Sequence, residues 1–572
     1  MSVVPPAMGH NYAATSGHDL ATLAAFEILE AGGNAVDAGI AAVLVLGVVY
    51  PDQVNIAGVA PMMIYDAKTE ELITIAGVGG WPKALDVDAF IERHNGEIPL
   101  GVRRTVVPAS PDACLQALER FGTLRYSDVA ARAIKYAAEG FPRHQVMLDY
   151  VTQYADDLRH FEDNMAILMP GGEIPALGSK LVQTDLARTL QFLCDEEATA
   201  GDDRLEGLAR VRRAFYAGDI ANTIVKHQRE NDGLLSAEDL ESFSCQTLPT
   251  LNRSYRLNDA DVEIHTCGAW SQGPTLHAAL GILEGVDAKS LGFGTDTYLH
   301  TVAESLKLAL SDREAYLGDP DFVDVPTAAW LSQSYGTAQR SRIDLKRATP
   351  GMPNPGSIEG FRPYLSPMVR DLEPPRLPAD TSIVATIDAS GNAFVCTPSD
   401  TSWDTPIVPG TGLAVSSRGA QSWAVKGHPS CLAPGKRPRL TPNPCFARIK
   451  GRWVMPFGTP GGDSQVQANA QFLLAHLTFG MGVQEAMEAP RIMTYSHPDS
   501  FAPHASHPGR LGVEGRFSHA VMDSLAARGH QVESKAEWTH ATGGLCAIQR
   551  DTETGELMSA ADPRRMSRAM AW

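Results

Sequence analysis

The sequence predicts an α+β protein in which β-sheets are stacked at the centre and helices lie on the outside, a layered αββα arrangement. Three observations favour this fold class. Apolar helical patterns fill the first fifty residues, a mainly helical stretch runs from about 108 to 345, and strand-like alternation dominates from 381 onward. With 572 residues, of which 44% are hydrophobic and 20% charged, the chain is long enough to bury a large core.

The first elements are expected to be a helix pair and a hairpin. Residues 19–31 form an apolar helical pattern that ends at a Gly-Gly pair, which suits the left-handed turn that closes a helix. A second helix is expected over 34–50, where alanine and glycine allow another element to approach closely. Strands are expected at 61–67 and 72–77, with a polar turn between them.

Between about 108 and 345 the pattern is mainly helical and predicts a helical lobe. The clearest helices are expected at 127–139, 183–196, 237–243 and 296–316, with a strand near 262–267. The composition then shifts, because eight prolines follow Thr349, at positions 350, 353, 355, 363, 367, 374, 375 and 378. Proline excludes regular helix and disfavours interior strand, so this stretch is expected to be a linker or an exposed loop.

The remainder of the chain is rich in strand signals. Strands are expected at 382–388, 392–397, 412–416 and 452–457. A Pro-Gly-Gly-Asp turn then precedes two helices and a closing strand pair, which are expected at 464–480, 483–489, 545–551 and 556–565.

Charge and cysteine usage exclude several classes of function. The formal net charge of −19, with 67 acidic and 48 basic residues, argues against a nucleic-acid partner or an anionic membrane surface. The eight cysteines show no CxxC spacing and no accompanying histidine cluster, so we expect buried reduced thiols, no metal and no cofactor. No secretory signal is apparent, and the apolar run 38–51 is too short to span a membrane, so a cytoplasmic protein is expected.

Thr381 stands at the start of the alternating hairpin 381–397, directly after Asp380. If the chain is cut between Asp380 and Thr381, this threonine carries a hydroxyl nucleophile and its own base, an α-amine with a pKa of about 8. Its β-branched side chain also fixes the direction of the hydroxyl. The proline-rich approach would hold such a scissile bond accessible and strained, although the composition alone favours an ordinary surface connection.

Five separated segments, at 24–51, 300–326, 381–397, 458–491 and 559–565, resemble the γ-glutamyltransferase family of N-terminal-nucleophile hydrolases, in the family's order. The resemblance implies a four-layer αββα sandwich made as one precursor. It also implies self-cleavage before Thr381 into a large subunit, 1–380, and a small subunit, 381–572, which together form one αββα unit. Assembly of the processed heterodimer into a homo-oligomer is left open.

The resemblance also assigns roles around Thr381. Ser399 occupies the position whose hydroxyl hydrogen-bonds the nucleophile, and its alternative is an ordinary turn serine. Gly461 and Gly462 match the paired glycines whose N–H groups form the oxyanion hole, although a plain turn would also use Pro-Gly-Gly. A helix that begins just after Asp463 would aim its positive end at the same place, which favours the catalytic interpretation.

The groups by which the family recognises a glutamyl substrate are absent. The segment 78–82 lacks the carboxylate-binding arginine, Gln421 replaces the acidic residue that holds the α-amine, and Leu440 with Thr441 replaces a serine pair. Thr401 stands where the family has asparagine. A zwitterionic head group needs one cation and one anion in a buried site, so the pattern retains the family's chemistry and loses its substrate recognition.

Replacement recognition groups are proposed from the same segments. Arg418 and Arg439 are candidates to bind a substrate carboxylate with two hydrogen bonds, and Trp81 and Trp403 are candidates to wall the substrate pocket. Gln421 is a further candidate to bind the substrate. The alternatives are a solvated charge or structural ion pair for each arginine, and a core position for each tryptophan.

The sequence therefore predicts an autoprocessed N-terminal-threonine amidohydrolase, in which Thr381 attacks a linear non-glutamyl amide and water hydrolyses the acyl-enzyme. A small carboxylate-bearing amide such as oxamate is a candidate substrate. True γ-glutamyl transfer or glutathione hydrolysis is the second hypothesis. An unprocessed pseudoenzyme that acts as a binding scaffold is the third.

Overall fold

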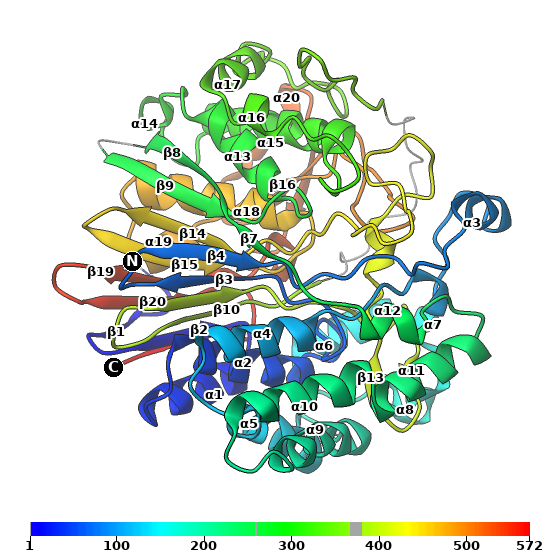
Figure 1. Ribbon diagram of the computed structural model, residues 1–572. Helices are drawn as coiled ribbons and strands as arrows, with labels where there is room; N and C mark the ends of the chain where they lie inside the picture. The colour runs from blue at the N-terminus through cyan, green and yellow to red at the C-terminus, as the bar shows by residue number, and fades with distance from the viewer. Residues whose placement is uncertain (1, 258–259, 366–379) are drawn as a thin grey trace.

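Two seven-stranded sheets lie face to face at the centre of the protein, and helices cover the outer face of each sheet (Figure 1). The computed structural model describes residues 2–257, 260–365 and 380–572. This arrangement confirms the predicted α+β fold with its four αββα layers.

The first sheet carries the predicted hairpin at its centre. All of its strand pairs are antiparallel, and its strands in spatial order are β21 (Arg568–Ala571), β2 (Ala13–Ser16), β10 (Val384–Ile387), β11 (Ala393–Cys396), β3 (Met62–Asp66), β4 (Glu71–Ile75) and β7 (Thr247–Pro249). Val384 pairs with Cys396 on one side and with Ser16 on the other. Thr381 therefore precedes a strand that is hydrogen-bonded on both edges.

The second sheet is also antiparallel and supplies the glycine turn. Its strands in spatial order are β1 (Ala7–Gly9), β20 (Leu557–Ala561), β19 (Cys546–Asp551), β15 (Trp453–Gly458), β14 (Cys445–Ile449), β9 (Ala260–Thr266) and β8 (Leu251–Leu257). Each sheet contains strands from both sides of residue 380, so neither part of the chain completes a sheet alone.

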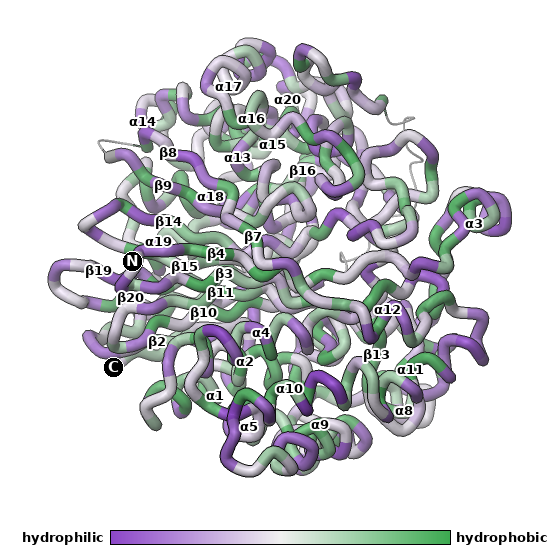
Figure 2. The backbone as a smooth tube through the Cα atoms, in the orientation of Figure 1, coloured by the Kyte–Doolittle hydropathy of each residue, from purple (hydrophilic) through white to green (hydrophobic). Residues whose placement is uncertain are grey.

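Strand alternation explains how the sheets stack. Ile383 and Ala385 face the second sheet and pack in one buried cluster with Phe446 and Val454, whereas Val384 faces the helices that cover the first sheet. Figure 2 shows hydrophobic residues along the central strands and α2, and hydrophilic residues at the outer loops.

The main helices form the two outer layers, and those between 108 and 345, which were expected as one lobe, are divided between the two layers. Those that cover the first sheet are α1 (Asp19–Glu30), α2 (Ala35–Val49), α4 (Ser110–Phe121), α5 (Tyr126–Glu139), α6 (Gln145–Gln153), α9 (Thr184–Ala198), α10 (Arg204–Tyr216) and α11 (Asp219–Glu230). Those that cover the second sheet are α13 (Gly273–Leu283), α15 (Asp296–Tyr316), α18 (Ser464–Leu473), α19 (Val483–Glu488) and α20 (His519–Ala527). The chain crosses from one layer to the other through β8 and β9.

Shorter elements connect these layers. The short helices are α3 (Val87–Arg93), α7 (Ala155–Leu158), α8 (Glu162–Leu168), α12 (Ala237–Glu241), α14 (Ala288–Leu291), α16 (Thr327–Trp330) and α17 (Gln333–Arg340). The minor strands are β5 (Phe141–Pro142), β6 (Lys180–Leu181), β12 (Ile407–Val408), β13 (Leu413–Ala414), β16 (Ile492–Thr494), β17 (Arg510–Glu514) and β18 (Gln531–Lys535). The strand expected at 412–416 is thus two residues long, and the helix expected at 464–480 changes to a π-helical turn at Leu474–Thr478.

The proline-rich stretch is irregular where the structure describes it. Residues 349–365 contain no helix or strand apart from an isolated bridge between Ile358 and Phe361. The prolines at 367, 374, 375 and 378 lie outside the described residues. The expectation that the bond after this stretch is accessible is wrong, because Asp380 and Thr381 are 0% and 1% exposed at the entry to a central strand.

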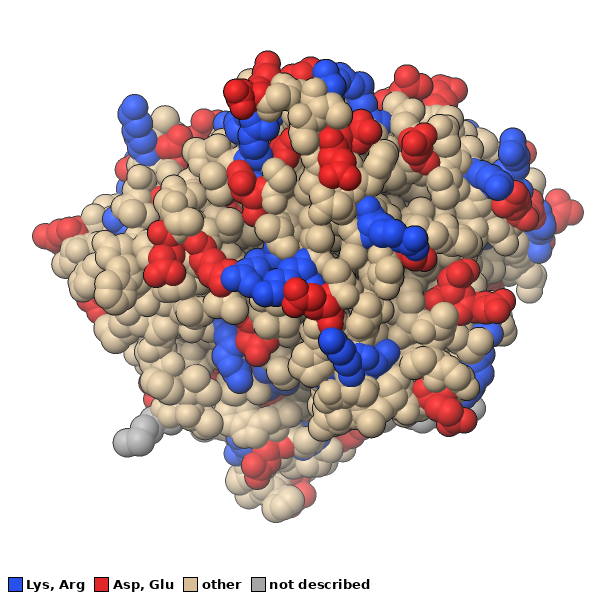
Figure 3. Space-filling view, turned by 90° about the horizontal axis from the view of Figure 1, so that it is seen from below, with Lys and Arg blue, Asp and Glu red and all other residues tan. Residues whose placement is uncertain are grey.

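The surface and the cysteines add little chemistry of their own. On the face seen in Figure 3, basic and acidic side chains are interspersed. All eight cysteines are free thiols; Cys431 is half-buried and the other seven are buried. Within the described residues, no helix has the length and apolar character that crossing a membrane requires.

Candidate active site

The register of the β10–β11 hairpin brings two hydroxyl groups together. Continuation of that register places Thr381 opposite Ser399, and the two residues form an isolated antiparallel bridge. Their Oγ atoms are 2.8 Å apart. The hydroxyl partner expected for Thr381 therefore lies within hydrogen-bond distance.

Two donors hold the carbonyl oxygen of Asp380, which belongs to the peptide bond that precedes Thr381. Ser399 Oγ donates to this oxygen at 2.9 Å, and Arg418 Nη2 donates to it at 3.2 Å. The same Arg418 nitrogen donates to Ser399 Oγ at 2.5 Å. Arg418 begins a short 3₁₀ turn, Arg418–Gln421, that is fully buried.

The side chain of Asp380 is fixed from three directions. Its Oδ1 accepts the N–H of Thr381 at 2.8 Å, and its Oδ2 accepts the hydroxyl of Tyr150 at 2.5 Å. Arg565 Nη2 lies 2.6 Å from the same Oδ2. Burial, together with the Asp380 carboxylate, raises the pKa of Tyr150 well above its ordinary value. Although burial opposes it, the Asp380 carboxylate also raises the pKa of Arg565. Both neighbours therefore stay protonated donors.

The two candidate oxyanion-hole glycines adopt backbone conformations that favour glycine. Gly461 has a φ of 120° and Gly462 a φ of 56°, and a Cβ added to Gly461 would lie 2.0 Å from Ser464 Oγ. Among the described residues, neither glycine N–H has a hydrogen-bond acceptor. Helix α18 begins at Ser464, so its positive end lies at this turn.

Sheet packing brings the glycine turn toward the nucleophile. The turn follows β15, whose last residue, Gly458, would place an added Cβ 2.7 Å from Ile383 Cδ1. Asp463 anchors the turn from the other side, because its carboxylate pairs with Arg313 and accepts the Ser500 hydroxyl at 2.6 Å. Against the effect of burial, the Arg313 guanidinium lowers the pKa of Asp463, so this carboxylate is ionised.

A large pocket opens beside Gly461. Its volume is about 740 Å³, and its apolar and aromatic lining includes Ile98, Leu100, Tyr154, Trp403, Met493 and Phe501. Trp403 stacks on Tyr154 with ring centroids 4.3 Å apart and an interplanar angle of 6°. Phe501 lies under the Arg418 guanidinium, 5.0 Å from ring centroid to Cζ. The pocket thus lies beside the glycine turn, and two of its lining residues contact side chains at the scissile bond: Tyr154 stacks on Tyr150, and Phe501 lies under Arg418.

The structure separates the residues expected to bind substrate. Trp403 lines the pocket, and Arg418 contacts the Asp380 carbonyl. Arg439 is instead buried against Glu314, with Nη2 2.7 Å from Oε1. Trp81 is buried and donates from Nε1 to Ser422 Oγ at 2.9 Å, and Gln421 donates to Thr441 Oγ1 at 2.9 Å.

Several residues of this site were not singled out from the sequence. Arg104 pairs with Asp404 at 3.0 Å, and Asp404 accepts the Thr401 hydroxyl at 2.7 Å, so the three residues form one network at the pocket wall. Arg565 lies in segment 559–565, which resembles the family, and this resemblance was the sequence feature that could have pointed to it. Tyr150 and Tyr154 sit on or beside α6, far from any motif, and no signal in the sequence pointed to them.

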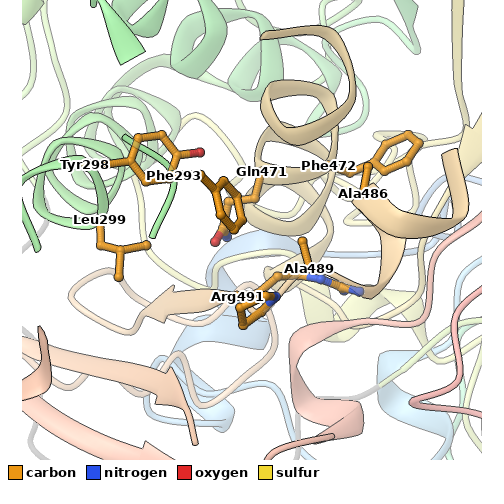
Figure 4. Close-up of a pocket in the computed structure, with 9 residues that line it drawn as sticks. Phe293, Tyr298, Leu299, Gln471, Phe472, Ala486, Ala489 and Arg491 are labelled. Carbon is orange, nitrogen blue, oxygen red and sulfur yellow. The ribbon is translucent and has the colours of Figure 1, made fainter. Parts of the chain in front are cut away.

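Two other features do not form part of this site. A hollow between α15 and α18, lined by residues that include Tyr298, Gln471 and Arg491, holds about 10 Å³, room for roughly one water molecule (Figure 4). His300 Nδ1 lies 2.8 Å from His530 Nε2 beside Glu304, whose carboxylate pairs with Lys307. These polar groups bond to one another in the core.

Asp499 gives the pocket wall a measurable pH dependence. Burial, followed by the nearby Asp463 charge, raises its pKa to about 7. Because this value exceeds the unfolded value of about 3.9, the folded state binds the extra proton, and the stability contributed by Asp499 decreases as pH rises from about 4 to about 7. We expect the melting temperature of Asp499→Asn, relative to the unsubstituted protein, to increase from about pH 5 to about pH 8. A difference that stays constant with pH in thermal melts contradicts this assignment.

The stacked sheets, with a hydroxyl pair at the entry to a central strand and a glycine turn beside it, define an enzyme of the N-terminal-nucleophile hydrolase class. Known proteins agree with this class. The crystal structure of a cephalosporin acylase from Bacillus halodurans superimposes with a TM-score of 0.84 at 26% identity, covering 100% of this chain and 98% of that one. The family model described as gamma-glutamyltranspeptidase matches residues 21–572, so the chain belongs to that family.

Curated relatives of this chain differ in the activity that their names describe. An Acylase ACY 1 proenzyme from Pseudomonas sp. (strain SE83) is 29% identical over 570 residues, which cover 97% of this chain and 92% of the relative. A glutathione hydrolase proenzyme from Escherichia coli (strain K12) is 28% identical over 564 residues, which cover 95% and 89%. Overall similarity therefore does not distinguish between acylase and glutathione hydrolase activity. The residues of the site have to provide that distinction.

Proposed function

We propose that this protein is an autoprocessed N-terminal-threonine amidohydrolase that hydrolyses a non-glutamyl amide through an acyl-enzyme on Thr381. The observation that carries the proposal is the Thr381–Ser399 hydroxyl pair at the start of β10, 2.8 Å apart and next to the Asp380 carbonyl. Similarity to proteins named proenzymes supports a cleaved mature form. Thr381 acts on the chain's own peptide bond first and on the substrate afterwards.

Cleavage at Asp380–Thr381 would give a large part, 1–380, and a small part, 381–572. Both sheets draw strands from both parts, so we expect the two parts to remain together as one αββα unit. The new α-amine of Thr381 then accepts the proton of its own hydroxyl as that oxygen attacks the substrate carbonyl. The N–H groups of Gly461 and Gly462 are the proposed oxyanion donors, since both lack an acceptor among the described residues.

The neutral pair at Gln421 and Thr441 argues against a glutamyl substrate. In the family, these positions carry the acidic group for the α-amine and a serine pair for the carboxylate. Here Gln421 donates to Thr441, and both side chains are buried. A zwitterion bound at this place would lose its water without gaining an anion for its amine, which is costly in a buried site.

The pocket favours an acyl group larger than oxamate. Its volume of about 740 Å³ lies in the range of roughly 300–1,000 Å³ typical of sites for drug-sized ligands. Its stacked Trp403 and Tyr154 suit an aromatic or extended apolar group. The cations proposed to anchor a small carboxylate have other partners, since Arg439 binds Glu314 and Arg418 binds Ser399. We propose the cytoplasm as the site of action on the sequence grounds given above.

A panel of chromogenic anilides tests this function. The purified protein, first shown by intact mass to be cleaved, is incubated with γ-glutamyl, oxamyl, acetyl and phenylacetyl anilides. We expect hydrolysis of the phenylacetyl substrate with a kcat/KM about 100-fold above that of the γ-glutamyl substrate. This factor corresponds to about 2.7 kcal/mol, and a buried charge that is left unpaired costs about 2–5 kcal/mol. Faster γ-glutamyl turnover would support the glutathione hydrolase hypothesis, and an intact chain of 61.4 kDa would support the scaffold hypothesis.

A further inference from the structure

The peptide bond between Asp380 and Thr381 is itself bound like a substrate. We propose that Arg418 is a catalytic residue for self-cleavage, donating together with Ser399 to the oxyanion that forms on the Asp380 carbonyl. This inference rests on the proposed function, because it requires cleavage at that bond. It assigns Arg418 to maturation of the chain, whereas the sequence suggested a role in binding substrate.

The number of protons and lone pairs on the Ser399 hydroxyl determines which group donates in each of its hydrogen bonds. A serine hydroxyl offers one proton and two lone pairs. Ser399 gives its proton to the Asp380 carbonyl and accepts Arg418 Nη2 on one lone pair. The remaining contact, to Thr381 Oγ, must therefore use the proton of Thr381. The lone pairs of the threonine oxygen are left available to attack the carbonyl carbon.

The surroundings of Arg418 support an electrostatic role. The side chain is fully buried, and among the described residues its Nε and Nη1 have no hydrogen-bond partner. The carboxylate of Asp400 lies 3.7 Å from Nε, beyond hydrogen-bond distance, and is itself bound by Ser416 and Ser417. Burying a cation with so few hydrogen bonds costs free energy, so its position at the scissile carbonyl suggests a function there.

The covalent steps balance without an external reagent other than water. Thr381 Oγ bonds to the Asp380 carbonyl carbon, and its proton passes through Ser399 as the carbonyl oxygen takes up charge between Ser399 and Arg418. The C–N bond then breaks, the electron pair stays on the Thr381 nitrogen, and that nitrogen takes up the proton. The resulting ester between Asp380 and Thr381 Oγ is hydrolysed by one water, which gives the α-carboxylate of Asp380 and restores the hydroxyl.

The Asp380 side chain acts on the opposite end of the same bond. Its Oδ1 accepts the N–H of the scissile amide, so the carboxylate stabilises the nitrogen as it becomes an amine. Tyr150 and Arg565 hold this carboxylate in place. Arg418 on the oxygen and Asp380 on the nitrogen thus polarise one peptide bond in the direction of its cleavage.

Self-cleavage of Arg418 variants tests the proposal. The folded monodisperse fraction of each variant is isolated by size exclusion, and the loss of intact chain is followed by mass spectrometry. We expect Arg418→Met to slow cleavage by about 100-fold, because removal of one oxyanion donor costs about this factor. Arg418→Lys retains a positive charge but not the planar guanidinium group, so we expect its cleavage rate to lie between those of the unsubstituted protein and Arg418→Met. This variant provides the test if Arg418→Met does not fold.

A matched control is Arg439→Met, which removes an equally buried arginine that contacts Glu314 and not Asp380. We expect its folded fraction to cleave at close to the unsubstituted rate. Equal slowing in both variants, or unchanged cleavage in Arg418→Lys and Arg418→Met, overturns the proposal for Arg418. Once cleaved, Arg418→Lys should show a smaller decrease in kcat for amide hydrolysis than in the rate of self-cleavage. Equal decreases in both rates would also overturn the proposal for Arg418. An unsubstituted chain that never cleaves overturns the proposed function as well, so the two failures are distinguishable.

Discussion

Thr381→Ala is expected to yield one uncleaved chain of 61.4 kDa that hydrolyses no amide. The substitution removes the hydroxyl oxygen that is proposed to attack the Asp380 carbonyl, and the same oxygen is the proposed nucleophile of the cleaved enzyme. The precursor should still fold, because Ser399 retains its bonds to Arg418 and to the Asp380 carbonyl. Intact mass and the anilide panel measure the two losses separately.

Thr381→Ser is the matched variant for that experiment. It restores the hydroxyl but removes the methyl group that limits χ1, so we expect cleavage at the same bond, slowed by about tenfold. Mass spectrometry of the small fragment locates the cut. A Thr381→Ala chain that still divides between residues 380 and 381 would place the nucleophile elsewhere and remove the basis of the proposed mechanism.

The fold could be predicted from the sequence because its strongest signals are local. The helix at 34–50 has Asn34 as its capping residue, and all fifteen residues of α2 are buried, so its apolar run has one interpretation. The proline-rich stretch was likewise expected to lack regular structure. The crossing of the helices from one outer layer to the other was not predictable, because it depends on the β8–β9 hairpin joining the second sheet through β14, which is distant from β9 in the sequence.

The candidate site also contains residues that the sequence could predict and residues that it could not. Ser399 could be assigned to Thr381 through the resemblance to the family, and the register of the folded hairpin places the two residues opposite each other. Arg418 and Arg439 could not be distinguished, since each is an arginine in a segment where the resemblance places substrate-recognising groups. Their roles follow from neighbours that folding supplies: Asp380 and Ser399 for one, Glu314 for the other. Tyr150 and Arg565, which hold the Asp380 carboxylate, are distant from each other in the sequence.

Gly461→Ala is expected to lower amide hydrolysis by about 100-fold while the chain still cleaves itself. At a φ of 120°, an alanine is strained, and its Cβ would lie 2.0 Å from Ser464 Oγ, so the turn must shift and its N–H groups move away from the substrate carbonyl. The matched control is Gly410→Ala, where φ is also positive at 76° but nothing lies within 4 Å of the added Cβ. That variant carries the backbone strain without any change at the turn, and its kcat should stay close to the unsubstituted value.

The separation of the two reactions in Gly461→Ala follows from geometry. The Asp380 carbonyl is held by Ser399 and Arg418, so the oxyanion of self-cleavage does not depend on the glycine turn. A substrate carbonyl arrives after Thr381 has become an N-terminus and approaches from the pocket that Gly461 lines. If one set of donors served both reactions, Gly461→Ala would block cleavage and hydrolysis together, and Arg418→Met would do the same. If Gly461→Ala impairs hydrolysis but not self-cleavage, and Arg418→Met slows self-cleavage, the two reactions use different oxyanion donors. Ser399 and Arg418 then serve the single self-cleavage, and the glycine turn serves each round of substrate hydrolysis.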